Sequence, residues 1–140
     1  MKKYEFIEHT ADVAVRIYGE TLNDLFTNSA CALIDLLIPR IPQGNKDKQV
    51  SLEAETLEDL LISWLNELIS LLFADCFLAT SFTLHITEEN NLKKLQADLQ
   101  GVDFDPYANT IKVEIKAATY HNLEIQHTRE GCRVDVIFDV

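Results

Sequence analysis

The sequence predicts an α+β protein in which a mostly antiparallel sheet of about eight strands packs with two helices. Two segments, at about 21–38 and 57–77, repeat apolar residues at helical spacing. Shorter segments in which apolar and polar residues alternate fill most of the remaining chain, as half-buried strands do. From residue 82 onward these segments follow one another without a helix between them, which favours antiparallel pairing.

The N-terminal part of the chain is expected to form two strands and a helix. Residues Tyr4 to Ile7 alternate and predict the first strand, and Val13 to Tyr18 predict the second, which Gly19 ends. Thr21 has the form of an N-cap because an acidic residue, Asp24, follows three positions later. The helix that begins there should run to about Ile38, where a proline follows.

The second helix is expected to be the centre of the core. A short alternating strand at 50–54 precedes it, and Thr56 repeats the N-cap pattern. Leucine and isoleucine cover most of the circumference between Leu57 and Phe77, so the helix should be covered on more than one side, with Trp64 buried. Its charged residues would each cost about 2.5–3.5 kcal/mol at a bilayer centre, which argues against a membrane span.

The two helix starts resemble each other. Residues 20–26 and 55–61 share the order Glu-Thr-Leu, then one variable residue, then Asp-Leu. Each segment follows a predicted strand. An internal strand-helix duplication would explain this, and so would independent use of the same capping pattern. Further strands are expected at 82–86, 95–99, 111–117, 123–125 and 134–140.

Length and charge limit the function classes. The 140 residues fit one domain, 1–140, with a single sizeable core. Twelve basic and 23 acidic residues give a formal net charge of −11, which argues against direct, tight nucleic-acid binding. A basic protein partner or a divalent cation suits this charge better, although a charged surface also serves solubility.

The cysteines indicate a reducing compartment. Cys31, Cys76 and Cys132 are far apart and form no paired motif for a disulfide framework or a zinc site. No apolar segment typical of a signal peptide follows the two lysines at the N-terminus. We therefore expect a cytoplasmic protein.

Acidic groups at the two ends of the chain are the first candidate site. The stretch 8–12 places His9 and Asp12 at a bend between two predicted strands, and the last strand ends at Asp139 and Val140. If the last strand pairs antiparallel with the strand from Val13, Asp12, Asp139 and the α-carboxylate of Val140 converge, with His9 at the rim. Such a group needs a cation or a retained proton. Ordinary strand capping is the alternative explanation.

Other chemistry-bearing patterns are weaker. The run 115–121 places Lys116 on the polar face of a predicted strand and ends in hydroxyl, phenol and imidazole groups at a turn, which an ordinary polar corner also explains. The glycines are isolated, and neither a phosphate-binding loop nor a nucleophile elbow is present.

Four motifs, in this order along the chain, resemble the archease family. They are the opening 4–13, the helical segment Trp64-Leu65-Asn66-Glu67-Leu68, the run 115–121 and the ending Asp139-Val140. The resemblance implies a protein cofactor, not an enzyme, of the GTP-dependent tRNA-splicing ligase. That ligase joins RNA ends carrying a 3′-phosphate or cyclic phosphate, and archeases promote its guanylylation and multiple turnover.

The resemblance also implies a metal site and shows some departures. Family members hold a divalent cation, taken to be Ca²⁺, at the positions of Asp12, Asp139 and Val140 here. Ala14 stands where the family usually has glycine, Asn109 where histidine is common, and Cys132 where an aromatic residue is usual. None of these three positions is an implied metal ligand.

Three functions are thus open. The first, favoured by the resemblance, is activation of an RNA ligase. The second is a metal-dependent hydrolase that uses Asp12 and Asp139 as ligands, with His9 or His121 as base. The third is an adaptor that uses only its acidic surface.

Overall fold

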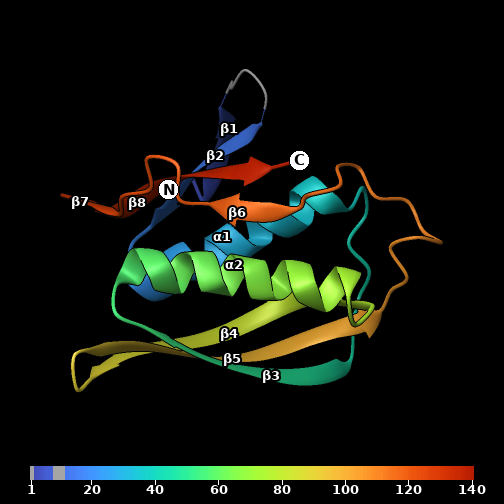
Figure 1. Ribbon diagram of the computed structural model, residues 1–140, viewed down its shortest axis with the longest axis horizontal. Helices are drawn as coiled ribbons and strands as arrows, with labels where there is room; N and C mark the ends of the chain where they lie inside the picture. The colour runs from blue at the N-terminus through green and yellow to red at the C-terminus, as the bar shows by residue number, and fades with distance from the viewer. Residues whose placement is uncertain (1, 8–11) are drawn as a thin grey trace.

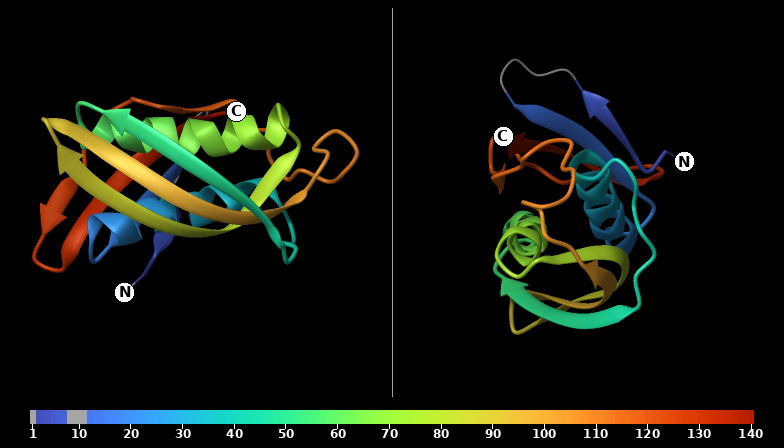
Figure 2. Two further views of the ribbon diagram at one scale, coloured as in Figure 1. Left: turned by 90° about the horizontal axis from the view of Figure 1, so that it is seen from below. Right: turned by 90° about the vertical axis from the view of Figure 1, so that its right-hand side faces the viewer.

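The computed structural model describes residues 2–7 and 12–140, in which two helices lie between two antiparallel sheets (Figures 1 and 2). The five-stranded sheet contains β1 (Tyr4–Ile7), β2 (Val13–Gly19), β6 (Ala117–Thr119), β7 (Gln126–Thr128) and β8 (Gly131–Asp139) within the described residues. The three-stranded sheet contains β3 (Lys46–Ala54), β4 (Phe77–Glu89) and β5 (Leu92–Asp103). The helices are α1 (Leu22–Leu37) and α2 (Leu57–Phe73).

The predicted fold class is confirmed. Eight strands and two helices are present in the described residues, and every strand pairing there is antiparallel. The strands divide between two sheets, ordered β1-β2-β8-β6 with β7 beside β8, and β3-β5-β4. Two sheets form because the two helices fill the space between them and bury apolar side chains on both sides (Figure 2, right).

Both helices begin as the capping pattern predicts. The side-chain oxygen of Thr21 accepts a hydrogen bond from the amide of Asp24 at 3.1 Å, and that of Thr56 accepts one from the amide of Asp59 at 3.0 Å. Each bond satisfies an amide that has no partner within the helix. The acidic side chains in the first turn also lie at the positive end of the helix dipole.

Helix α2 ends at Phe73, earlier than the predicted end at about Phe77. Cys76 has the left-handed backbone φ of 53°, and Phe77 already begins β4, where it lies opposite Asp103 of β5. The apolar run therefore spans the end of a helix and the start of a buried strand. Periodicity alone cannot separate these two states in so short a run.

The buried core is centred on Trp64, as expected. Its side chain is fully buried, and its indole Nε1 donates a hydrogen bond to the carbonyl of Phe26 at 3.0 Å. The ring also meets Phe82 of β4 edge-to-face, with 6.0 Å between centroids. Trp64 therefore ties α2 to α1 and to the three-stranded sheet.

Two strand predictions in the last third were wrong. In the segment 111–117 only Ala117 is in a strand, because the preceding backbone follows an irregular path on which Lys112 donates its amide to the carbonyl of Leu37. The strand expected at 123–125 begins only at Gln126, and the amide of Ile125 donates to Glu58 instead. Ile115 and Ile125 are buried, so their alternation reports packing without a strand ladder.

No helix in the described part of the chain combines the length and apolar character needed to cross a bilayer. The three cysteines are free thiols.

Candidate functional site

The first residues of β2 and the last residues of β8 lie side by side in the five-stranded sheet. β2 pairs antiparallel with β8, and Val13 lies opposite Phe138. Asp12 directly precedes Val13 and Asp139 directly follows Phe138, so the two aspartates occupy opposing positions in the same register. This is the pairing on which the predicted acidic site depends. We call Asp12, Asp139 and Val140 the terminal corner.

Strand β6 fixes the other side of the terminal corner. Ala117 pairs with Asp139, and the amide of Lys116 donates to the main-chain carbonyl of Asp139 at 2.8 Å. The backbone of Asp139 is thus held between two strands. Its side chain is exposed, that of Val140 is 39% exposed, and Asp12 is half-buried. His9, predicted at the rim, lies outside the described residues.

The donor atoms of the terminal corner fit a hard cation. The corner offers two carboxylate side chains and the oxygens of Val140, and oxygen ligands are those that Ca²⁺ prefers. Among the described residues, at this corner or elsewhere, no three His, Cys, Asp or Glu side chains are grouped so that they could hold a metal. A cation here would therefore depend on main-chain oxygens and water as well as on Asp12 and Asp139.

The motif runs 64–68 and 115–121 meet at a single side chain. The Oδ1 atom of Asn66 accepts a hydrogen bond from the amide of Ala118 at 2.8 Å, and its Nδ2 atom lies 3.5 Å from the carbonyl of Ala118. β6 pairs with β8 along one edge, and the side-chain amide of Asn66 bonds to the backbone of β6 on its other edge. We call this contact the Asn66 clamp, since it positions the strand that supports Asp139.

The end of the run lies away from the terminal corner. Beyond Thr119, which pairs with Ile137, the chain continues toward the first turn of α2. There Tyr120 contacts Asp59, and its partial burial and this carboxylate raise the pKa of the phenol. His121 follows four residues after Ala117, the residue that pairs with Asp139. The hydrolase in which His9 or His121 acts as base stays a prediction.

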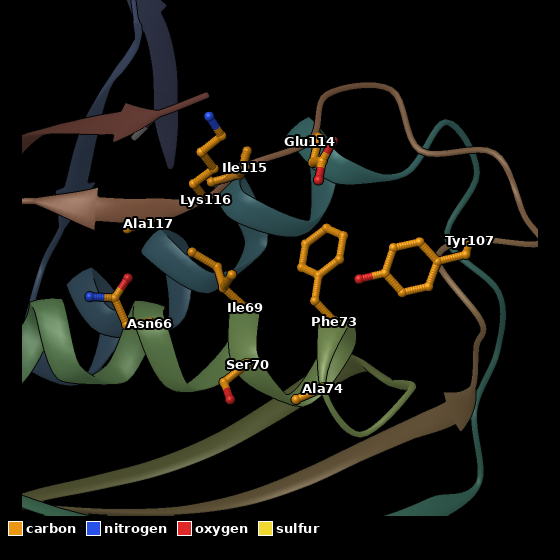
Figure 3. Close-up of a pocket in the computed structure, with 10 residues that line it drawn as sticks. All are labelled: Asn66, Ile69, Ser70, Phe73, Ala74, Tyr107, Glu114, Ile115, Lys116 and Ala117. Atoms are coloured by element: carbon orange, nitrogen blue, oxygen red, sulfur yellow. The ribbon is translucent and has the colours of Figure 1, made fainter.

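An open pocket of about 480 Å³ is lined in part by Lys116 and Ala117, the two residues that contact the backbone of Asp139 (Figure 3). It lies between the last turn of α2 and the segment 107–117. Phe73 and Tyr107 form an edge-to-face ring pair in it, with 6.5 Å between centroids. We call this the aromatic pocket. The sequence analysis missed it.

A local signal for Tyr107 exists in hindsight. Asp105 precedes a proline, and its carboxylate accepts a hydrogen bond from the amide of Tyr107 at 2.9 Å, which makes a tight turn. The side chain of Asn109 closes the same turn by donating to the carbonyl of Asp105 at 2.9 Å. The turn leaves Tyr107 78% exposed. The turn at Asp105 therefore holds the ring of Tyr107 out toward solvent.

The departures from the family pattern have structural roles. Asn109 supports the turn that presents Tyr107. Cys132 is buried, its thiol lies 3.5 Å from the carbonyl of Gly19, and burial raises its pKa. Ala14 is buried in β2.

Comparisons with known proteins identify the family of the chain. The model of the Archease protein family matches residues 4–140. Protein archease of Methanosarcina acetivorans is 36% identical over 141 residues, covering 99% of this chain and 97% of the relative. Protein archease of Archaeoglobus fulgidus is 36% identical over 139 residues, covering 99% of both. The solution structure of Methanobacterium thermoautotrophicum protein 1598 is 26% identical with a TM-score of 0.84, covering 100% of both chains. The chain belongs to the archease family.

Proposed function

We propose that this protein is a non-enzymatic activator of a GTP-dependent RNA ligase. The ligase would join RNA ends carrying a 3′-phosphate or cyclic phosphate, in tRNA splicing or RNA repair, and this protein would promote its guanylylation and multiple turnover. The observation that supports the proposal is the pairing of β2 with β8 in a member of the archease family, because it sets Asp12 opposite Asp139.

In this function Asp12, Asp139 and Val140 would hold a divalent cation, most simply Ca²⁺. Such a cation supplies positive charge among the carboxylates when it is bound. The chain's own contribution is positional. The amide of Lys116 fixes the carbonyl of Asp139, and the Asn66 clamp fixes the strand to which Lys116 leads.

The charge of the protein supports action on the ligase and not on RNA. With a formal net charge of −11, the chain lacks the electrostatic attraction on which phosphate binding depends. A ligase that holds GTP and RNA phosphates needs a cationic active site. The acidic surface would therefore be steered toward the ligase, and salt should weaken the encounter.

The test is a single-turnover guanylylation assay without RNA. We expect Asp12→Ala and Asp139→Ala to suppress stimulation of the ligase. Asp98→Ala is the matched control because Asp98 is exposed on β5, in the sheet on the far side of the helices (Figure 1). Wild-type protein that leaves guanylylation unchanged, or that acts only when RNA is present, would contradict the proposal.

Two further measurements separate the cation from the activity. In calorimetric titration with Ca²⁺, Asp12→Ala should weaken binding at least about tenfold while its urea unfolding stays cooperative. Purified protein should hydrolyse no phosphate ester in the presence or absence of the cation. Turnover that is lost in Asp12→Ala would favour a metal-dependent hydrolase instead.

A further inference from the structure

We propose that the aromatic pocket receives an arginine side chain of the ligase and so forms a second docking point beside the terminal corner. The identity of the partner rests on the proposed function. The chemistry of the ligand rests on the pocket itself, in which three independent features favour a planar cation.

The first feature is the pair of aromatic rings. Phe73 is the last residue of α2 and Tyr107 projects from the turn at 105–109, with 63° between their ring planes. Tyr107 is the most exposed large hydrophobic side chain of the described residues, at 78%. An exposed aromatic face attracts a cation through its quadrupole, and guanidinium groups stack on such faces more often than ammonium groups do.

The second feature is the carboxylate of Glu114. In Figure 3 it points from the loop toward the rings of Phe73 and Tyr107. Within the described residues no hydrogen bond or ion pair engages this carboxylate. The neighbouring Lys116 extends away from the rings (Figure 3) and forms no ion pair with Glu114 there. The carboxylate is therefore free to accept two hydrogen bonds from one guanidinium.

The third feature is the C-terminal end of α2. Ser70, Phe73 and Ala74, at the C-terminal end of α2, line the pocket. The last carbonyls of a helix carry the negative end of its dipole, and cations are favoured there. The last turn of α2 contains no basic residue. Nothing in this turn competes with a cation from a partner.

Arginine is a better occupant than lysine or an apolar side chain. A pocket of about 480 Å³ that is open to solvent accommodates a guanidinium with its aliphatic stem. The net charge of −11 selects a basic partner surface, and the fork geometry of arginine matches a carboxylate beside a ring. Lysine would match only the charge.

The location explains why such a contact would serve activation. Lys116 and Ala117 line the aromatic pocket, and the same two residues hold Asp139 by a hydrogen bond and by strand pairing. A ligase that inserts an arginine into the pocket would therefore meet the terminal corner in a fixed orientation. Two contacts on one rigid surface raise affinity more than either contact alone.

The first experiment measures the Kd of the purified ligase for this protein by calorimetry at fixed salt. Tyr107→Ala and Glu114→Gln should each raise the Kd about 5- to 30-fold, whereas Tyr107→Phe, which keeps the ring, should stay within about twofold. Glu55→Gln is the control because it removes the same charge at the opposite end of α2. Equal affinity of wild type, Tyr107→Ala and Glu114→Gln would overturn the proposal.

The second experiment uses a small probe and needs no ligase. In an NMR titration, N-acetyl-arginine methylamide should shift the signals of Phe73, Tyr107 and Glu114 in a saturable manner. The citrulline analogue has the same shape without the charge and should not do so. Equal shifts with both probes, or none with arginine, would refute the arginine pocket. If the wild type neither binds nor stimulates the ligase, the proposed function fails, and this titration still decides the chemistry of the pocket.

Discussion

Replacing Trp64 by alanine tests the account of the core most directly. The indole is fully buried between the helices and the three-stranded sheet, so its removal leaves a large cavity. Loss of a buried aromatic side chain costs about 3–5 kcal/mol. The hydrogen bond from Nε1 to the carbonyl of Phe26 accounts for about 0.5–1.5 kcal/mol of this, and the edge-to-face contact with Phe82 for a similar amount. We therefore expect Trp64→Ala to lower the free energy of unfolding by 3–5 kcal/mol.

The measurement is urea denaturation followed by far-ultraviolet circular dichroism, because Trp64 is the single tryptophan and its fluorescence disappears with it. Trp64→Phe keeps an aromatic ring but loses the hydrogen bond, so it should cost about 1–3 kcal/mol. A loss below about 1 kcal/mol for Trp64→Ala would mean that Trp64 is not a core residue. Equal losses for both variants would refute the view that packing outweighs the hydrogen bond.

Three more predictions follow from close contacts. Gly101→Ala would place a Cβ atom 2.1 Å from the carbonyl oxygen of Leu78. Urea denaturation should therefore show that the free energy of unfolding falls by more than about 2 kcal/mol. A fall of less than about 0.5 kcal/mol would contradict the contact. Partial burial and, to a smaller extent, the neighbouring carboxylate of Asp35 raise the pKa of Tyr4 to about 12. The stability that this shift contributes is present below the unfolded pKa of about 10 and is lost as pH rises through about 12. In a spectrophotometric tyrosine titration, Tyr4→Phe should remove the step near pH 12. Asn66→Ala should increase the hydrogen-exchange rate of the Ala118 amide, because that amide loses its acceptor.

Local side-chain chemistry made much of the fold predictable. Thr21 and Thr56 cap helices exactly where the spacing of the acidic residues indicates, because the cap depends only on neighbouring residues. The antiparallel pairing of the strand from Val13 with the last strand, which the sequence offered only as a condition for the acidic site, is present. Non-local information was needed to divide the strands between two sheets.

The wrong predictions fall in segments where the pattern of buried side chains does not reveal the hydrogen bonding of the backbone. Ile111, Val113 and Ile115 pack against the core and thus alternate like a strand. The backbone between them instead bonds to the end of α1, through the amide of Lys112. The end of α2 was placed too late because apolar residues continue through Cys76 into β4. The Asp-Pro turn marks Tyr107 as a loop residue, but the pocket was missed because only the fold brings Phe73 of α2 beside that loop.

The Asn66 clamp links the core to the terminal corner, and this makes Asn66→Ala informative. Ala118 is only 5% exposed, so loss of the Oδ1 acceptor would leave its amide buried and unpaired, at a cost of about 1–3 kcal/mol. Asn66→Asp keeps the acceptor and should cost less. If the clamp positions Asp139 through Lys116, hydrogen exchange should quicken at Ala118 and Lys116 in Asn66→Ala, and stimulation of the ligase should fall with it. Unchanged protection of both amides would show that pairing with β8 holds β6 without help from α2.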